Sequence, residues 1–211
     1  MKNLKISQFL ERLSMGGPIP GGGSASALAG ALSASLLCMV ANLTTGKSGY
    51  EGVKKEVEEI RERAEALRRR LLDAVEEDCQ GYEQVISAFR LPKDTEAQRQ
   101  KRSRFIQEAY KRAAQTPLEV SQISLALLDL CEAMVEKGNI SAVSDAGVAF
   151  YLADATLRGG LMNVRINLSA LTDETYQKAT KRTVDEIEKR GNLLKGRIQD
   201  LLLSKLANHL R

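Results

Sequence analysis

The run from Gly21 to Leu43 constrains the fold of this chain more than any other segment. It carries no charged residue, and 14 of its 23 side chains are Gly, Ala or Ser. A helix of such small residues has little bulk of its own to bury, so it suits a place where other backbones or a ligand approach its axis closely. Three consecutive glycines open the run, namely Gly21, Gly22 and Gly23.

The start of this helix has the features of an anion-binding site. The glycines leave its first N–H groups accessible, and Ser24 is well placed to cap it. However, no strand pattern precedes the glycines, and no Gly-Lys-Ser or Gly-Lys-Thr follows at the spacing of a nucleotide phosphate loop. The sequence therefore predicts close helix packing here, with substrate approach as the alternative.

The whole chain has a helical pattern. Aromatic residues make up only 4% of it, Trp is absent, and no useful stretch alternates apolar and polar residues as a strand does. The apolar faces of long helices are hard to bury completely inside one small monomer, so such helices suggest an oligomer. We therefore predict an all-α, multihelical antiparallel bundle that forms a single domain over residues 1–211 and assembles as a dimer. The expected helices cover about 9–13, 22–45, 51–89, 96–112, 117–138, 144–168 and 173–202.

Composition indicates a soluble protein of a reducing compartment. The 27% charged and 43% hydrophobic content is that of a globular chain. Residues 25–43 are long enough to span a membrane, but their Ala, Ser and Gly content makes them weakly hydrophobic. The chain starts without an apolar run of signal-peptide type, and its odd number of cysteines, 3, favours free thiols. We expect a cytoplasmic protein with no membrane partner.

Charge and histidine content exclude several classes of site. The only histidine is His209, near the end of the chain. Most Ser–His or Cys–His catalysis and any His-rich metal site are thereby excluded, so we expect no metal. The net charge of +4 suggests an anionic partner. Few aromatic residues accompany that charge, which disfavours nucleic acid.

Asp78 is the best candidate for chemistry. It lies in the apolar seam of the predicted helix 51–89, between the small residues Ala74 and Gly81. An acid that faces inward beside small side chains is typical of a pocket, where it can donate or accept a proton. The alternatives are a structural ion pair with an Arg, or a place at the edge of an acidic turn. The seam consists of Val57, Ile60, Ala64, Leu67, Leu71, Ala74, Asp78, Gly81 and Val85.

Two asparagines form a second polar cluster. Asn163 and Asn167 are four residues apart on one face of an otherwise apolar helix, so they need partners if they are buried. They either hydrogen-bond nearby backbone or bind a heterocycle with several donors and acceptors. The pattern alone leaves both interpretations open.

Taken in order, these segments resemble the formiminotetrahydrofolate cyclodeaminase and methenyltetrahydrofolate cyclohydrolase family. The resemblance covers nearly the whole chain. Its motifs are Pro20–Ser24 with its small helix, Met39–Thr44, Gly46-Lys47, Asp78 with Tyr82, Arg90–Thr95, Pro117-Leu118, Gly138-Asn139 with Ser144-Asp145, Asn163–Leu168 and Thr172–Glu174.

The resemblance implies an all-helical dimer that acts on a tetrahydrofolate derivative without a further cofactor. It also implies that Asp78 is the catalytic proton donor or acceptor. The residues that it implies for substrate binding are Gly21, Gly22, Gly23, Ser24, Tyr82, Asp145, Asn163 and Asn167.

Two reactions fit this family, and both need one well-placed acid or base. No formiminotransferase domain is present, so we predict a methenyltetrahydrofolate cyclohydrolase, with formiminotetrahydrofolate cyclodeaminase as the alternative. A second alternative is a non-catalytic helical assembly protein whose basic face binds an acidic partner. In that case the seam around Asp78 should be filled and no folate should bind.

Overall fold

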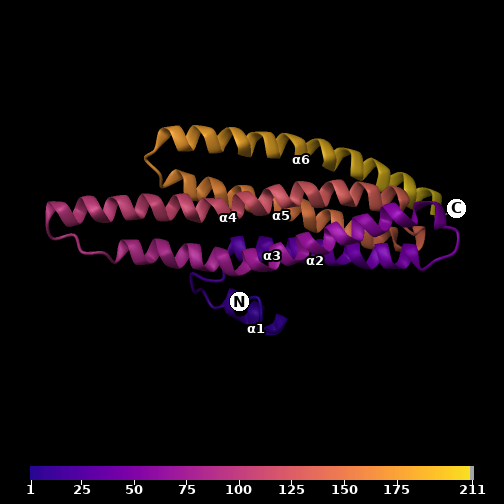
Figure 1. Cartoon of the computed structure of the whole chain (residues 1–211), viewed down its shortest axis with the longest axis horizontal. Helices are drawn as coiled ribbons and strands as arrows, with labels where there is room; N and C mark the ends of the chain where they lie inside the picture. Colours follow the sequence, from indigo (N-terminus) through magenta and orange to yellow (C-terminus); the bar gives the residue numbers. More distant parts are fainter. Residues whose placement is uncertain (210–211) are drawn as a thin grey trace.

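The structure, a computed structural model, describes the backbone of residues 1–209 and the side chains of residues 1–207, so the side chain of His209 lies outside the described part. No strand occurs among residues 1–209, which confirms the all-α prediction. Figure 1 shows the long helices along one axis, with the α3–α4 hairpin projecting at one end and α1 standing apart. The elements are α1 (Ile6–Ser14), α2 (Gly22–Thr45), the 3-10 turn η1 (Glu51–Val53), α3 (Lys54–Phe89), α4 (Glu96–Lys137), the 3-10 turn η2 (Ile140–Ala142), α5 (Val143–Ser169) and α6 (Glu174–His209).

Helix α2 is the slim helix that the sequence predicts, and it packs against α3, α4 and α5. A Cβ atom added at Gly30 would lie 3.0 Å from the Thr156 methyl group and 3.1 Å from a Leu71 methyl group. The small side chains also reach backbone, since Ser33 Oγ donates to the Ala149 carbonyl at 2.7 Å. Close packing along α2 is therefore confirmed.

By length and composition alone, α2 is apolar enough to cross a membrane. Half of its most apolar window is nevertheless buried inside the bundle. The core of a helical bundle contains helices of this kind, so the composition of α2 agrees with its central position.

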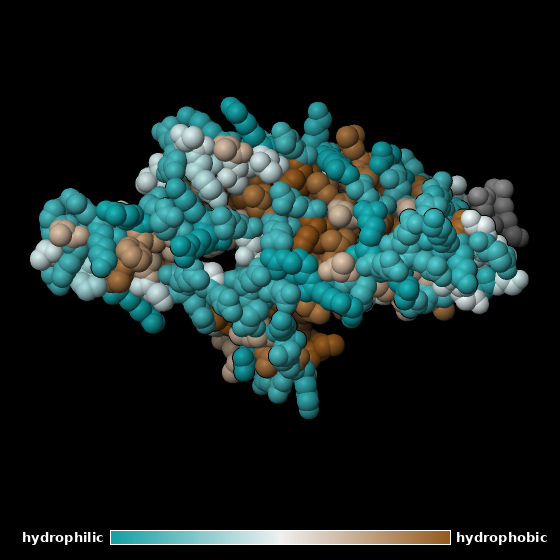
Figure 2. Space-filling model, in the orientation of Figure 1, coloured by the Kyte–Doolittle hydropathy of each residue, from teal (hydrophilic) through white to brown (hydrophobic). Residues whose placement is uncertain are grey.

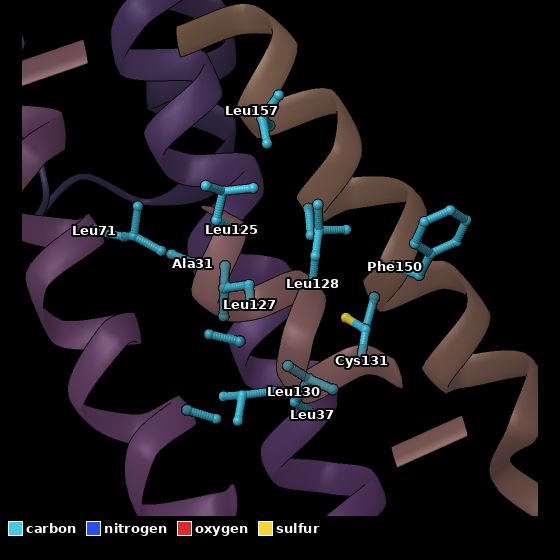
Figure 3. Close-up of a cluster of buried hydrophobic side chains, with 14 of the residues drawn as sticks. Ala31, Leu37, Leu71, Leu125, Leu127, Leu128, Leu130, Cys131, Phe150 and Leu157 are labelled. Atoms are coloured by element: carbon cyan, nitrogen blue, oxygen red, sulfur yellow. The ribbon is translucent and has the colours of Figure 1, made fainter. Parts of the chain in front are cut away.

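The core lies where α2, α3, α4 and α5 meet. Leu127 and Leu128 of α4 are fully buried, as is Phe150 of α5. Figure 3 shows these side chains with Leu71 and Ala31 in one cluster. Burying each Leu or Phe side chain contributes about 1.5–3 kcal/mol, so this cluster stabilises the packing of the four helices against one another.

One helix boundary predicted from the sequence is wrong. Thr116-Pro117 suggests a helix start, but α4 runs without a break from Glu96 to Lys137, with Pro117 inside it. Proline lacks the N–H that would bond the carbonyl four residues earlier, which is that of Ala113. Asn167 of α5 supplies the missing donor, because its Nδ2 lies 3.0 Å from the Ala113 oxygen.

We expect Asn167→Ala to lower the free energy of unfolding by about 1–3 kcal/mol, since it leaves the Ala113 carbonyl without this partner. Urea unfolding measures the loss. Pro117→Ala provides the control, because alanine restores the backbone N–H at that position. The loss from Asn167→Ala should be smaller in the Pro117→Ala background, and strictly additive effects would contradict this account.

Candidate active site

A cavity of about 440 Å³ lies at the N-terminal end of α2, bounded by α3, α4, α5 and the segment before α2. Figure 2 shows the molecule hollowed between α3 and α4, close to where α2 begins in Figure 1. Seven of the nine predicted site residues line this one cavity: Gly21, Gly22, Gly23, Asp78, Tyr82, Asn163 and Asn167.

Asp78 lies half-buried against the first turn of α2. Its Oδ2 accepts a hydrogen bond from Ser24 Oγ at 2.8 Å. A Cβ atom at Gly23 would lie 2.6 Å from Asp78 Cγ and 2.8 Å from Oδ2, so no side chain fits between them. The glycine therefore lets the carboxyl group sit directly on the helix N-terminus, where the helix dipole favours negative charge.

Burial raises the pKa of Asp78 above its ordinary value, because desolvation disfavours the charged carboxylate. The hydroxyl and the backbone N–H of Ser24 act in the opposite direction and lower that pKa. The balance favours a carboxyl group that takes up a proton more readily than an exposed aspartate. This property suits a general base that must later act as an acid.

Two of the predicted binding residues do not line the cavity. Ser24 is fully buried, so it contacts Asp78 and lies behind it. Asp145 lies in the first turn of α5, 18 residues before Asn163. At 1.5 Å per residue that separation is about 27 Å along the helix. The structure therefore does not bring Asp145 to the other predicted residues.

The asparagine pair is bound mainly to backbone. Asn163 Nδ2 donates to the Gly159 carbonyl at 2.8 Å. Asn167 Nδ2 donates to the carbonyls of Ala113 and Asn163, each at 3.0 Å. The backbone alternative is thus confirmed for the amide nitrogens, while both residues still line the cavity. Their amide oxygens are the groups that can accept a hydrogen bond from a ligand.

The sequence pattern does not predict that α4 contributes to the site. Tyr110 and Ala113 line the cavity opposite α2, together with Ile19 before α2 and Ile166 on α5. These are ordinary apolar or aromatic positions on helices, and no local pattern separates them from core residues. Only Tyr110, an aromatic in the basic stretch of α4, could have been singled out from the sequence.

The basic residues at the projecting hairpin are remote from the cavity. Arg99 donates to Glu96 in the first turn of α4, and neither Arg99 nor Lys101 lines the cavity. Figure 1 places the start of α4 at the projecting tip. A binding role for these two cations in the described cavity is therefore not supported.

The arrangement suits proton transfer. Of the residues that line the cavity, Asp78 is the one with a carboxyl group. Among the described side chains, those of residues 1–207, no cluster of three His, Cys, Asp or Glu could hold a metal ion. The open space beside Asp78 also contradicts the assembly-protein alternative, which requires a filled seam at this point.

The sequence and the fold both resemble known folate enzymes. Residues 5–186 match the family model for formiminotransferase-cyclodeaminase. A methenyltetrahydrofolate cyclohydrolase from Methylorubrum extorquens is 36% identical over 204 residues, which cover 97% of this chain and 98% of that protein.

The formimidoyltransferase-cyclodeaminase of Rattus norvegicus is 27% identical over 182 residues, and the aligned part is only 34% of that longer protein. The crystal structure of formiminotetrahydrofolate cyclodeaminase from Thermotoga maritima superposes with a TM-score of 0.87 at 31% identity. The superposition covers 97% of this chain and 98% of that one.

Proposed function

The chain belongs to the formiminotransferase-cyclodeaminase family, and on this premise we propose that it hydrolyses 5,10-methenyltetrahydrofolate to 10-formyltetrahydrofolate. The observation that carries the proposal is the half-buried Asp78 carboxyl group in a cavity large enough for a ligand. The cyclohydrolase relative of nearly equal length favours this reaction over deamination.

Asp78 performs two of the three proton transfers of the reaction. Water adds to the methenyl carbon between N5 and N10, and Asp78 takes a proton from that water as the new C–O bond forms. The bond from the carbon to N5 then breaks, Asp78 returns its proton to N5, and the remaining hydroxyl proton leaves to solvent. The methenyl bridge carries a positive charge, so the carboxylate also attracts the substrate.

The other lining residues position the substrate. Tyr82 and Tyr110 offer aromatic surface to the flat pterin ring. The amide oxygens of Asn163 and Asn167 can accept hydrogen bonds from its N–H groups. Proton transfer and positioning suffice for this reaction, so the proposal includes no metal and no cofactor besides the tetrahydrofolate substrate.

The same site could perform cyclodeamination, and the Thermotoga maritima relative named for that activity supports this second candidate. There N10 attacks the carbon of the N5-formimino group, and Asp78 protonates the departing ammonia.

Parallel absorbance assays separate the two reactions. With 5,10-methenyltetrahydrofolate as substrate, we expect its absorbance to decay at a rate proportional to protein concentration. With 5-formiminotetrahydrofolate as substrate, we expect no protein-dependent formation of the methenyl compound. Decay of the methenyl compound at the uncatalysed rate would contradict the cyclohydrolase proposal, and rapid formation of it would favour the cyclodeaminase.

We further propose a cytoplasmic homodimer with neither nucleic acid nor membrane as partner. Support for dimerisation comes from apolar side chains that one chain leaves uncovered. On α1, Ile6 and Met15 are 72% and 73% exposed, and Figure 2 shows hydrophobic residues over this projecting helix. Leu32 and Leu43 of α2 are also exposed. Sedimentation of the purified protein as a monomer would contradict the dimer.

A further inference from the structure

Ser24 contacts several groups behind the candidate active site. Its hydroxyl oxygen lies 2.8 Å from Asp78 Oδ2, 3.2 Å from the Val75 carbonyl oxygen and 3.3 Å from Cys79 Sγ. Ser24 is fully buried and Cys79 nearly so, so water does not compete for these contacts. All three partners belong to α3, while Ser24 belongs to the first turn of α2.

A hydroxyl group has one hydrogen to donate and two lone pairs that accept. Two acceptors, Asp78 Oδ2 and the Val75 carbonyl, compete for that one hydrogen. We propose that Ser24 is a positioning residue for Asp78, whose hydroxyl hydrogen turns between these two acceptors as Asp78 loses and gains its proton. The proposal rests on the proposed role of Asp78 as the proton carrier.

The Ser24 hydroxyl hydrogen then has an acceptor in each protonation state of Asp78. When Asp78 is ionised, the Ser24 hydroxyl donates to Oδ2, and the Cys79 thiol can donate to Ser24 Oγ. When Asp78 carries the proton on its other oxygen, Oδ1, the uncharged Oδ2 is a weaker acceptor, and the Ser24 hydrogen turns to the Val75 carbonyl. No heavy atom moves between the two states.

The Cys79 thiol fits the role of a donor in this arrangement. Burial raises its pKa above the ordinary value of 9.0, so the sulfur keeps its hydrogen at neutral pH. A neutral S–H adds a weak donor to the Ser24 oxygen without placing a second negative charge beside Asp78. The buried thiol thus supports the hydroxyl and takes no part in the reaction itself.

The proposal is tested by the titration of Asp78 in the free protein. Aspartate labelled with ¹³C at its carboxyl carbon gives an NMR titration curve for each site, and the Asp78 signal is the one lost in Asp78→Asn. Among the side chains of residues 1–207, Ser24 alone donates a hydrogen bond to this carboxyl group, and Ser24→Ala removes that bond. We therefore expect the Asp78 midpoint to move to higher pH, because the ionised form loses a donor.

Ser33→Ala is the matched control. Ser33 is also a fully buried serine of α2 that donates to a carbonyl of a neighbouring helix, but its partner is Ala149. It should leave the Asp78 midpoint unchanged while causing a similar loss of stability. An unchanged midpoint in Ser24→Ala, or an equal rise in both variants, would overturn the proposal.

A kinetic measurement separates this proposal from the proposed function. If Asp78 is the base, the acid limb of the pH profile for methenyltetrahydrofolate hydrolysis should move in Ser24→Ala in the same direction as the NMR midpoint. We expect a rate loss of about tenfold or more on that limb and a smaller loss on the plateau. An NMR shift without a kinetic shift would uphold the role of Ser24 and contradict that of Asp78.

Discussion

Replacing Asp78 with asparagine is expected to lower the hydrolysis of 5,10-methenyltetrahydrofolate by about 10²- to 10⁴-fold, the usual contribution of a general acid or base. Asparagine has nearly the same shape, and its oxygen can still accept the hydrogen bond from Ser24. It cannot take a proton from water at any working pH. The loss should therefore fall mainly on kcat, measured by the decay of methenyl absorbance.

Asp73→Asn is the control for this variant. Asp73 lies on the same helix, but it is exposed and pairs with Lys2 outside the cavity. The same change of acid to amide should leave hydrolysis unchanged there. Full activity in Asp78→Asn would remove Asp78 from the mechanism.

The stability of Asp78→Asn should also depend on pH in a defined way. Burial holds the folded pKa of Asp78 above its ordinary value of 3.8, so the folded state binds this proton more tightly than the unfolded chain does. The stability that this group contributes is complete below the ordinary pKa and is lost as pH rises through the raised folded pKa. Asparagine does not titrate. The unfolding free energy of Asp78→Asn should therefore increase relative to that of the wild type as the pH rises from the ordinary pKa of Asp78 to its raised folded pKa.

Gly23→Ala should cause the second largest effect. Alanine normally stabilises a helix interior relative to glycine by about 0.5–1 kcal/mol. Here the added Cβ would overlap the Asp78 carboxyl group, whose Cγ would lie 2.6 Å away. Asp78 or the first turn of α2 must shift, and a displacement of about 1 Å at a catalytic group can cost roughly 10²-fold in rate.

Two other glycines give matched comparisons. Among the described residues outside its own helical turn, no atom lies within 4 Å of a Cβ added at Gly196 of α6, so Gly196→Ala should leave hydrolysis unchanged. At Gly22 the nearest atom would be Asn163 Nδ2 at 3.6 Å, an ordinary contact. Gly22→Ala should therefore fold normally, as judged by its thermal midpoint. A wild-type kcat in Gly23→Ala would show that hydrolysis does not require the close contact between the Asp78 carboxyl group and the first turn of α2.

The parts of the site that could be predicted from the sequence are those that break a helical pattern. Asp78 interrupts an apolar seam, and the run after Gly21 lacks both charge and bulk. Asn163 and Asn167 put two amides on an apolar face. Each of these features is unfavourable in an ordinary packed helix and is tolerated only where the tertiary structure provides space or hydrogen-bond partners. The structure brings residues from all three features to one cavity.

The remaining features depend on contacts between distant segments. Pro117 looks like a helix start because its local chemistry is that of one, and only the donor from Asn167 on another helix lets α4 continue. Ser24 looks like a helix cap, but its hydroxyl points to α3. Tyr110 becomes a cavity residue only because α4 lies opposite α2. Local sequence does not encode these pairings.

The most direct measurement is the crystal structure of the protein with a stable reduced folate bound. Our account predicts that the ligand occupies the cavity at the N-terminus of α2. The carbon that bridges N5 and N10 should then lie close enough to Asp78 for one water molecule to join them. A ligand bound elsewhere, for example in the apolar groove of the α3–α4 hairpin around Phe105, or bound with its bridge carbon turned away from Asp78, would contradict the account.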